Sequence, residues 1–202
     1  MKSIFNRICE KFRNDSIIVI VSGLPRSGTS MMMRMIEAGG VEVVTDNIRM
    51  ADVDNPRGYY EFEKVKRIKN DSSWLKGCRN KAFKMVSELL YHLPRNEKYK
   101  VVFMRRDMDE MLASQQKMLE NLKKSSSSVS NDEMKIIYGK HLRKLKQWLE
   151  EQENIDVLYI SFNDVIRNPL ENAEKVNDFL GGNLNMKKMS HVVEEALYRQ
   201  RK

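Results

Sequence analysis

The chain has 202 residues, about the length of one domain and enough to bury a core. Hydrophobic residues make up 41% and charged residues 32%, and no apolar run approaches the ~20 residues that span a bilayer. The net charge of +8 arises from 36 basic and 28 acidic residues that are interspersed, which argues against a nucleic-acid module. We therefore expect a single cytoplasmic domain over 1–202, with no stable membrane insertion and no nucleic-acid partner.

Neither the first fifteen residues nor the two cysteines predict a catalytic or binding site. Apolar side chains recur in 1–15 at helical spacing and are interrupted by charges, which predicts a short N-terminal helix packed on the domain. Cys9 and Cys78 have neither a C-x-x-C spacing nor a neighbouring histidine cluster. They predict no disulfide framework and no metal site.

A strand, a turn and a helix follow one another in 17–38. Five aliphatic residues, 17–21, run into a turn that contains Gly23, Pro25 and Gly28, which is typical of a strand buried on both faces of a parallel sheet. A helix is expected over 30–38, with two glycines as its stop signal. Because unpaired N–H groups and the dipole at a helix N-terminus favour an anion, this segment predicts a phosphate-binding loop.

The cation of this loop is displaced from its position in nucleotide-binding P-loops. Residues 23–30 match the frame G-x-x-x-x-G-x-[ST], but Thr29 stands where a nucleoside triphosphatase has its lysine. The basic residue is instead Arg26, whose guanidinium can donate a pair of hydrogen bonds to a terminal oxyanion without a metal ion. A magnesium-dependent P-loop nucleotide kinase is an alternative that Thr29 argues against.

The run LPRSGTS, residues 24–30, resembles the 5′-phosphosulfate loop of the sulfotransferases, whose usual form is P-[KR]-S-G-T-[ST]. It is especially similar to the arginine form found in tyrosylprotein sulfotransferases and their bacterial relatives. The resemblance implies transfer of a sulfuryl group from 3′-phosphoadenosine-5′-phosphosulfate (PAPS) to a hydroxyl or amine, with no metal. The loop residues implied in holding the donor are Arg26, Ser27, Gly28, Thr29 and Ser30.

Residues 41–44 predict a second, short strand, and Asp46 follows it. Asp46 should therefore lie on the same edge of the sheet as the loop, although the residues alone favour a simple cap of a turn or helix. Tyrosylprotein sulfotransferases have a general-base glutamate at a similar spacing, followed by an arginine. The resemblance implies Asp46 as the base and Arg49 near the substrate, with Glu61 and Glu63 as reserve bases.

Tyr59 and Tyr60 follow a turn and could line a substrate or adenine pocket, or equally cover an edge of the core. Residues 82–86 predict a third strand. Cytosolic small-molecule sulfotransferases end the equivalent strand with a catalytic histidine, which is missing here, whereas Lys84 retains the family's lysine position and could face the transferred group. The expected substrate contacts are therefore Arg49, Tyr59, Tyr60, Glu61 and Lys84.

A second charged element follows another predicted strand at 101–104. Asp107 should cap the helix that begins there. Arg106 and Ser114 are eight residues apart, about two helical turns, so both should face one side of that helix. This spacing resembles the sulfotransferase element that holds the ribose 3′-phosphate.

The remaining segments complete an alternating pattern of strands and helices. They are a flexible Ser-rich loop at 122–131, a helix at 133–152 and a strand at 155–160, followed by a segment that resembles the closing helix of sulfotransferases, with Phe162 in place of its usual tyrosine. The pattern predicts a P-loop-like α/β fold of three α/β/α layers with a mainly parallel sheet of about five strands. Because the tyrosine is missing, a non-catalytic nucleotide-binding protein of the same fold is a further alternative; the acceptor and the oligomeric state are unknown.

Overall fold

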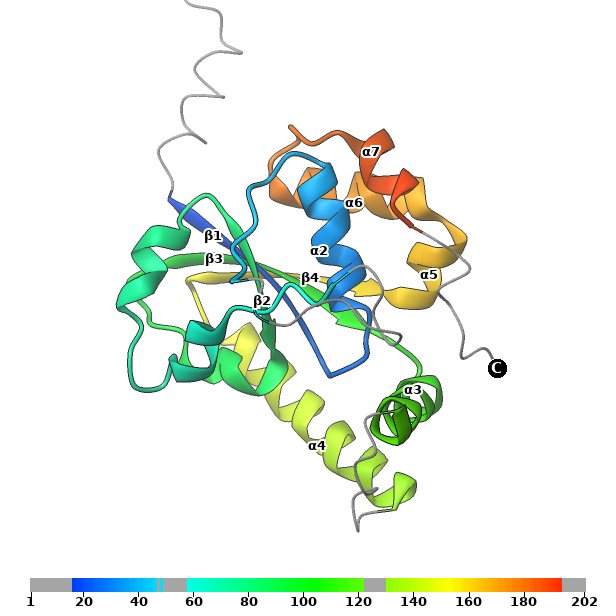
Figure 1. The fold of residues 1–202 in the computed structure, drawn as a ribbon. Helices are drawn as coiled ribbons and strands as arrows, with labels where there is room; N and C mark the ends of the chain where they lie inside the picture. The colour runs from blue at the N-terminus through cyan, green and yellow to red at the C-terminus, as the bar shows by residue number, and fades with distance from the viewer. Residues whose placement is uncertain (1–15, 47, 49–57, 122–129, 194–202) are drawn as a thin grey trace, which may run out of the picture.

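A computed structural model describes residues 16–46, 48, 58–121 and 130–193 (Figure 1). The predicted N-terminal helix at 1–15 and most of the predicted Ser-rich loop lie outside the described residues. Every other predicted helix and strand falls within them.

The centre of the fold is a parallel sheet of four strands in the order β2-β1-β3-β4 (Figure 1). These strands are β1 (Ile17–Gly23), β2 (Ala82–Val86), β3 (Lys98–Arg105) and β4 (Ile155–Ser161). Strand β1 is buried along nearly its whole length, since both faces of a parallel sheet are covered. The α/β class predicted from the sequence is confirmed.

The predicted strand at 41–44 is reduced to a single bridge between Val43 and Ala82, so the sheet has four strands among the described residues, where about five were expected. The reason is a change of backbone partner just after the bridge. Val44 N still donates to Ala82 O at 2.7 Å, but Asp46 N donates to Glu61 O at 3.2 Å. The chain thus leaves β2 and pairs with the segment that returns toward α2.

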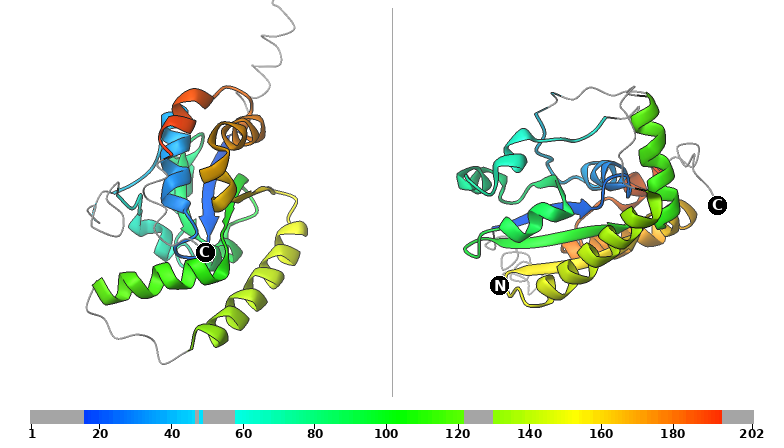
Figure 2. Two further views of the ribbon diagram at one scale, coloured as in Figure 1. Left: turned by 90° about the vertical axis from the view of Figure 1, so that its right-hand side faces the viewer. Right: turned by 90° about the horizontal axis from the view of Figure 1, so that it is seen from below.

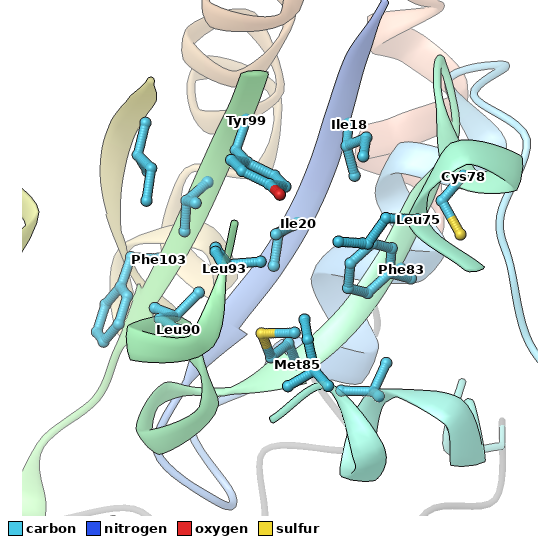
Figure 3. Packing of buried hydrophobic residues seen from close by; sticks show 14 of the residues in the cluster. Ile18, Ile20, Leu75, Cys78, Phe83, Met85, Leu90, Leu93, Tyr99 and Phe103 are labelled. Carbon is cyan, nitrogen blue, oxygen red and sulfur yellow. The ribbon is translucent and has the colours of Figure 1, made fainter. Parts of the chain in front are cut away.

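Side chains that alternate along the strands divide the core between the two faces of the sheet. On one face, Ile18 and Ile20 pack against Phe83 and Tyr99 (Figure 3). This face is covered by α4 (Asn131–Glu150) and by three short 3₁₀ helices, η1 (Glu63–Arg67), η2 (Ser73–Cys78) and η3 (Ser87–His92). Within it, the rings of Trp74 and Phe83 pack edge to face with their centroids 5.3 Å apart. The sequence did not indicate this partner for Trp74.

The opposite face holds a methionine-rich cluster in which Val19 and Val21 pack against the helix that follows β1. The helices on this side are α2 (Thr29–Ala38), α5 (Phe162–Arg167), α6 (Pro169–Leu180) and α7 (Met186–His191) (Figure 1). The predicted first helix is therefore confirmed to within one residue.

Helix α3 (Met108–Asn121) lies beyond the sheet, where it crosses the N-terminal half of α4 (Figure 2). Asp107 caps it as predicted, because its Oδ1 accepts from the backbone N–H groups of Asp109 at 3.0 Å and Glu110 at 3.2 Å. Met111 and Leu112 pack with Leu24 of the loop after β1. The loop is thereby tied to α3.

The parallel strands place three chain segments at one edge of the sheet. Gly23 at the end of β1 is in register with Met104, and Arg105 at the end of β3 is in register with Ser161. The loop after β1, the turn at Arg106 and the start of α5 are therefore neighbours, at the edge where ligands bind in open parallel sheets.

Glycines with positive φ stand at both ends of α2, for different reasons. Gly28 has φ +95°, and a Cβ there would lie 2.4 Å from Cδ2 of Phe162, so the site requires both the backbone freedom and the missing side chain. Gly40 has φ +108° and no atom within 4 Å of the position of a Cβ. Gly40 thus needs only the backbone freedom.

These two glycines give a matched pair of variants. Gly40→Ala should lower the free energy of unfolding by about 1–2 kcal/mol, the cost of the left-handed conformation for an L-residue. Gly28→Ala should cost about 1–3 kcal/mol more, because the ring of Phe162 must move. Urea unfolding measures both, and equal losses would show that Phe162 does not constrain the loop.

Candidate active site

Residues 23–30, which we call the anion loop, turn sharply at Arg26. Arg26 has a left-handed backbone with φ +66°, uncommon for a residue other than glycine, asparagine or aspartate. Its carbonyl oxygen accepts from Nη1 of Arg106 at 3.2 Å, and its own Nε donates to Oγ of Ser114 at 3.1 Å. The loop arginine and both residues of the predicted second phosphate element are therefore in contact.

The anion loop leads directly into the N-terminus of α2, which begins at Thr29. Gly28 provides no side-chain cap, and the first turn of α2 contains no acidic residue. The N-terminus of α3, by contrast, is capped by the carboxylate of Asp107. The first turn of α2 thus has the N–H groups and the positive dipole of a helix with no acidic residue of its own to neutralise them, an arrangement that suits an anion.

Lys84 lies on the other side of the anion loop, on the strand next to β1. Its Nζ donates to the carbonyl oxygen of Tyr59 and lies 3.5 Å from Oγ of Ser30. The same Ser30 Oγ donates to Tyr59 O at 3.2 Å. Lys84 and Ser30, both predicted from the sequence, therefore meet, and the buried Tyr59 joins them through its backbone.

Tyr60 also holds the 58–62 segment to α2. Its hydroxyl donates to Oε2 of Glu37 at 2.5 Å, and its backbone is left-handed with φ +52°. Burial, and then the hydrogen bond to Glu37, raises the pKa of the Tyr60 hydroxyl above its ordinary range. Tyr60 is therefore a neutral donor at physiological pH that fastens this segment beside the anion loop.

Asp46 uses both carboxylate oxygens to connect two segments. Oδ2 accepts from the backbone N–H of Glu63 at 2.6 Å, and Oδ1 accepts from that of Ile48 at 3.1 Å. These bonds, Glu63's first, lower the pKa of Asp46. The geometry is that of a turn cap, the explanation that the residues alone favoured.

The two reserve bases, Glu61 and Glu63, also lie close to Asp46. Glu61 accepts through its carbonyl from Oγ1 of Thr45 at 2.9 Å and from Asp46 N at 3.2 Å. The carboxylate of Glu63 pairs with Lys66 on the surface. Arg49 lies outside the described residues.

Glu110 and Asn163, two residues that the sequence did not indicate, are connected to Arg106 by hydrogen bonds. The carboxylate of Glu110 lies 3.3 Å from Nε of Arg106 and accepts from Nδ2 of Asn163 at 3.2 Å. The centroid of the Phe162 ring lies 4.3 Å from Cζ of Arg106. The spacing of four residues between Arg106 and Glu110 was the available signal for the first contact, whereas Asn163 comes from a distant segment.

A pocket of about 370 Å³ adjoins this cluster at the ends of β3 and β4. The residues that line it are Arg105, Arg106, Asp107, Tyr159 and Ser161. Only Arg106 among these was a predicted site residue. Tyr159 and Ser161 join it through the register of β3 and β4, which the sequence does not reveal. In the described part of the chain, no His, Cys, Asp or Glu side chains form a group that could hold a metal ion.

Within the described ranges, no helix combines the length and apolar character needed to cross a bilayer.

Several solved structures with a similar fold are sulfotransferases, at low sequence identity to this chain. The sulfotransferase domain of the curacin biosynthetic pathway has 14% identity and a TM-score of 0.53, with 88% of this chain and 77% of that one covered. The domain from the Synechococcus PCC 7002 olefin synthase has 12% identity and a TM-score of 0.53, with coverage of 94% and 89%. A mouse sulfotransferase complexed with PAP has 17% identity and a TM-score of 0.53, with coverage of 92% and 65%.

At these levels of identity, the similarities show that this chain has the same fold as the three structures, and no more. No curated protein matches the sequence. The model of the sulfotransferase domain matches residues 16–202, which is nearly the whole chain and includes the anion loop and the Arg106–Ser114 element. The chain therefore belongs to the sulfotransferase family.

Proposed function

We propose that the protein is a PAPS-dependent sulfotransferase that transfers a sulfuryl group to a hydroxyl or amine acceptor. The observation that carries the proposal is the position of Arg26. It lies within a loop that opens an uncapped helix N-terminus, and it contacts both Ser114 and Arg106. A ligand with phosphates at two positions of one nucleoside is the natural partner of two such elements in contact.

The anion loop would bind the 5′-phosphosulfate end of the donor. Backbone N–H groups of Ser27 to Ser30 and the hydroxyls of Thr29 and Ser30 are suited to the 5′-phosphate. Arg26 would hold the bridging and sulfuryl oxygens, and Lys84, which already reaches Ser30, would face the transferred group. The cations act where negative charge develops on the leaving phosphate.

Arg106 and Ser114 would bind the 3′-phosphate of the same nucleotide. Their contacts with Arg26 support this assignment, since both residues adjoin the loop that would hold the 5′ end. The mouse sulfotransferase of the same fold was solved with PAP, the desulfated product adenosine 3′,5′-bisphosphate. A shared fold and matching motif residues make PAPS, the sulfated form of this nucleotide, the donor to test first.

The acceptor would approach from the side of Asp46 and the 58–62 segment, where Arg49, Tyr59, Tyr60 and Glu61 are the proposed substrate contacts. During transfer, the bond between sulfur and the bridging oxygen breaks as the acceptor oxygen or nitrogen bonds to sulfur. The acceptor loses its proton to Asp46, and adenosine 3′,5′-bisphosphate leaves. By analogy with phosphoryl transfer, the protein mainly positions the reactants and stabilises charge.

One observation favours the non-catalytic alternative. Both carboxylate oxygens of Asp46 already accept backbone hydrogen bonds, which makes it a weaker base. A protein that binds the bisphosphate but shows no turnover with any acceptor would have this second function. Incubation of PAPS with alcohol, phenol and amine acceptors, with chromatographic detection of bisphosphate, separates the two functions.

Arg26→Ala should lower the rate of bisphosphate formation by about 100-fold or more, because a cation at the reacting group is lost. Arg95→Ala, at an exposed position on the opposite edge of the sheet, is the control that matches the change in charge. It should leave the rate unchanged. A folded Arg26→Ala protein with normal turnover would contradict the proposed mechanism.

The pH dependence of turnover tests Asp46 as the base. A base acts in its ionised form, and the backbone hydrogen bonds that lower the pKa of Asp46 keep its carboxylate ionised across the neutral and mildly acidic range. The acid side of the kcat profile should therefore be flat between pH 5 and 8, and Asp46→Asn should lower kcat about 100-fold with little change in donor affinity. An acid limb near pH 6 that persists in Asp46→Asn would assign the base elsewhere.

A further inference from the structure

A buried ion pair lies directly behind the anion loop. Only 8% of the side chain of Arg106 and 5% of that of Glu110 is exposed. Burial of two charges is costly unless each is well paired and hydrogen-bonded. Here Glu110 receives hydrogen bonds from Arg106 and from Asn163, and Arg106 also has the ring of Phe162 against its guanidinium.

The guanidinium of Arg106 also contacts the backbone of the anion loop. Nη1 of Arg106 donates to the carbonyl oxygen of Arg26 at 3.2 Å, while Nε of the same guanidinium is directed at Glu110. Because a guanidinium is planar and rigid, fixing one of its edges with a carboxylate also fixes the direction of the other nitrogens. The position of Glu110 thus determines where Arg106 meets the loop.

Arg26 is the point of the loop that most needs such support. Its left-handed backbone is unfavourable for a residue with a Cβ, and such conformations persist only where surrounding contacts hold them. The same cluster also restrains Gly28, since Phe162 fills the space where a Cβ would stand. The cluster therefore supports the loop on both sides of Ser27.

We propose that Glu110 is a positioning residue of the anion loop. It orients Arg106 so that the Arg26 carbonyl is held in the left-handed turn, and it anchors Asn163 beside Phe162. The inference rests on the proposed function for the identity of the anion, although the support of the loop does not depend on a ligand. Glu110 would not itself touch the substrate.

The opposite edge of the sheet offers a matched control pair. Glu97 has a carboxylate that is 5% exposed, and it pairs with Arg79 through bonds of 2.9 and 2.8 Å. This pair lies at the N-terminal ends of β2 and β3, away from the anion loop. Glu97→Gln therefore removes a comparable buried charge without disturbing the residues around Arg26.

Amide hydrogen exchange, followed by mass spectrometry without any ligand, compares Glu110→Gln with Glu97→Gln. In Glu110→Gln, peptides that cover 23–30 should exchange about tenfold faster, and peptides from 79–97 should be unchanged. Glu97→Gln should show the reverse. Unchanged exchange in the loop, or equal acceleration in both regions, would overturn the proposal.

A second variant covers the case in which Glu110→Gln does not fold. Arg106→Lys retains a positive charge opposite Glu110 but lacks the fork that joins Glu110 to the Arg26 carbonyl. It should give the same local loss of protection over 23–30. Normal protection in a folded Arg106→Lys protein would contradict the role assigned to the pair.

Calorimetric binding of adenosine 3′,5′-bisphosphate then links the loop to the ligand. Affinity should fall about tenfold in Glu110→Gln and remain at the wild-type value in Glu97→Gln. If the wild-type protein does not bind the bisphosphate, the proposed function fails, whereas the exchange experiment still decides the role of Glu110. Wild-type affinity in Glu110→Gln would contradict that role.

Discussion

The structure depends on one tight turn between β1 and α2, in which a left-handed arginine is followed two residues later by a glycine pressed against an aromatic ring. This turn directs the N-terminus of α2 at the edge of the sheet and leaves it without a carboxylate cap. The turn is contacted on both sides. Arg106 donates a hydrogen bond to the carbonyl oxygen of Arg26, and the ring of Phe162 fits closely against Gly28.

The parallel sheet supplies the charges around this turn. Arg26 follows β1, Lys84 lies on β2 and Arg106 follows β3, so neighbouring strands place three cations around one helix N-terminus. Glu110 neutralises part of this charge behind the loop, whereas no acidic residue occupies the first turn of α2 in front of it. The asymmetry favours an anion on the side of the loop that faces away from Glu110.

Local sequence patterns predicted most of this arrangement. The aliphatic run of β1, the displaced arginine and the spacing of Arg106 and Ser114 are short-range signals, and the structure brings Arg26, Arg106 and Ser114 into contact. The fourth partner, Glu110, carried only the weak signal of helical spacing. Asn163 and the β4 side of the pocket could not be predicted, because they depend on strand register. The prediction of a full strand at 41–44 was wrong because the backbone just after it, at Asp46, hydrogen-bonds to Glu61, a contact that no local pattern reveals.

We propose that the anion loop binds the phosphosulfate end of a nucleotide with two separate phosphates, and not the triphosphate of ATP. Isothermal titration of the wild-type protein with adenosine 3′,5′-bisphosphate and with ATP, each with and without Mg²⁺, tests it most directly. The bisphosphate should bind equally well in both conditions and much more tightly than ATP. Tight binding of ATP that requires Mg²⁺, with none of the bisphosphate, would contradict it and indicate a nucleotide kinase.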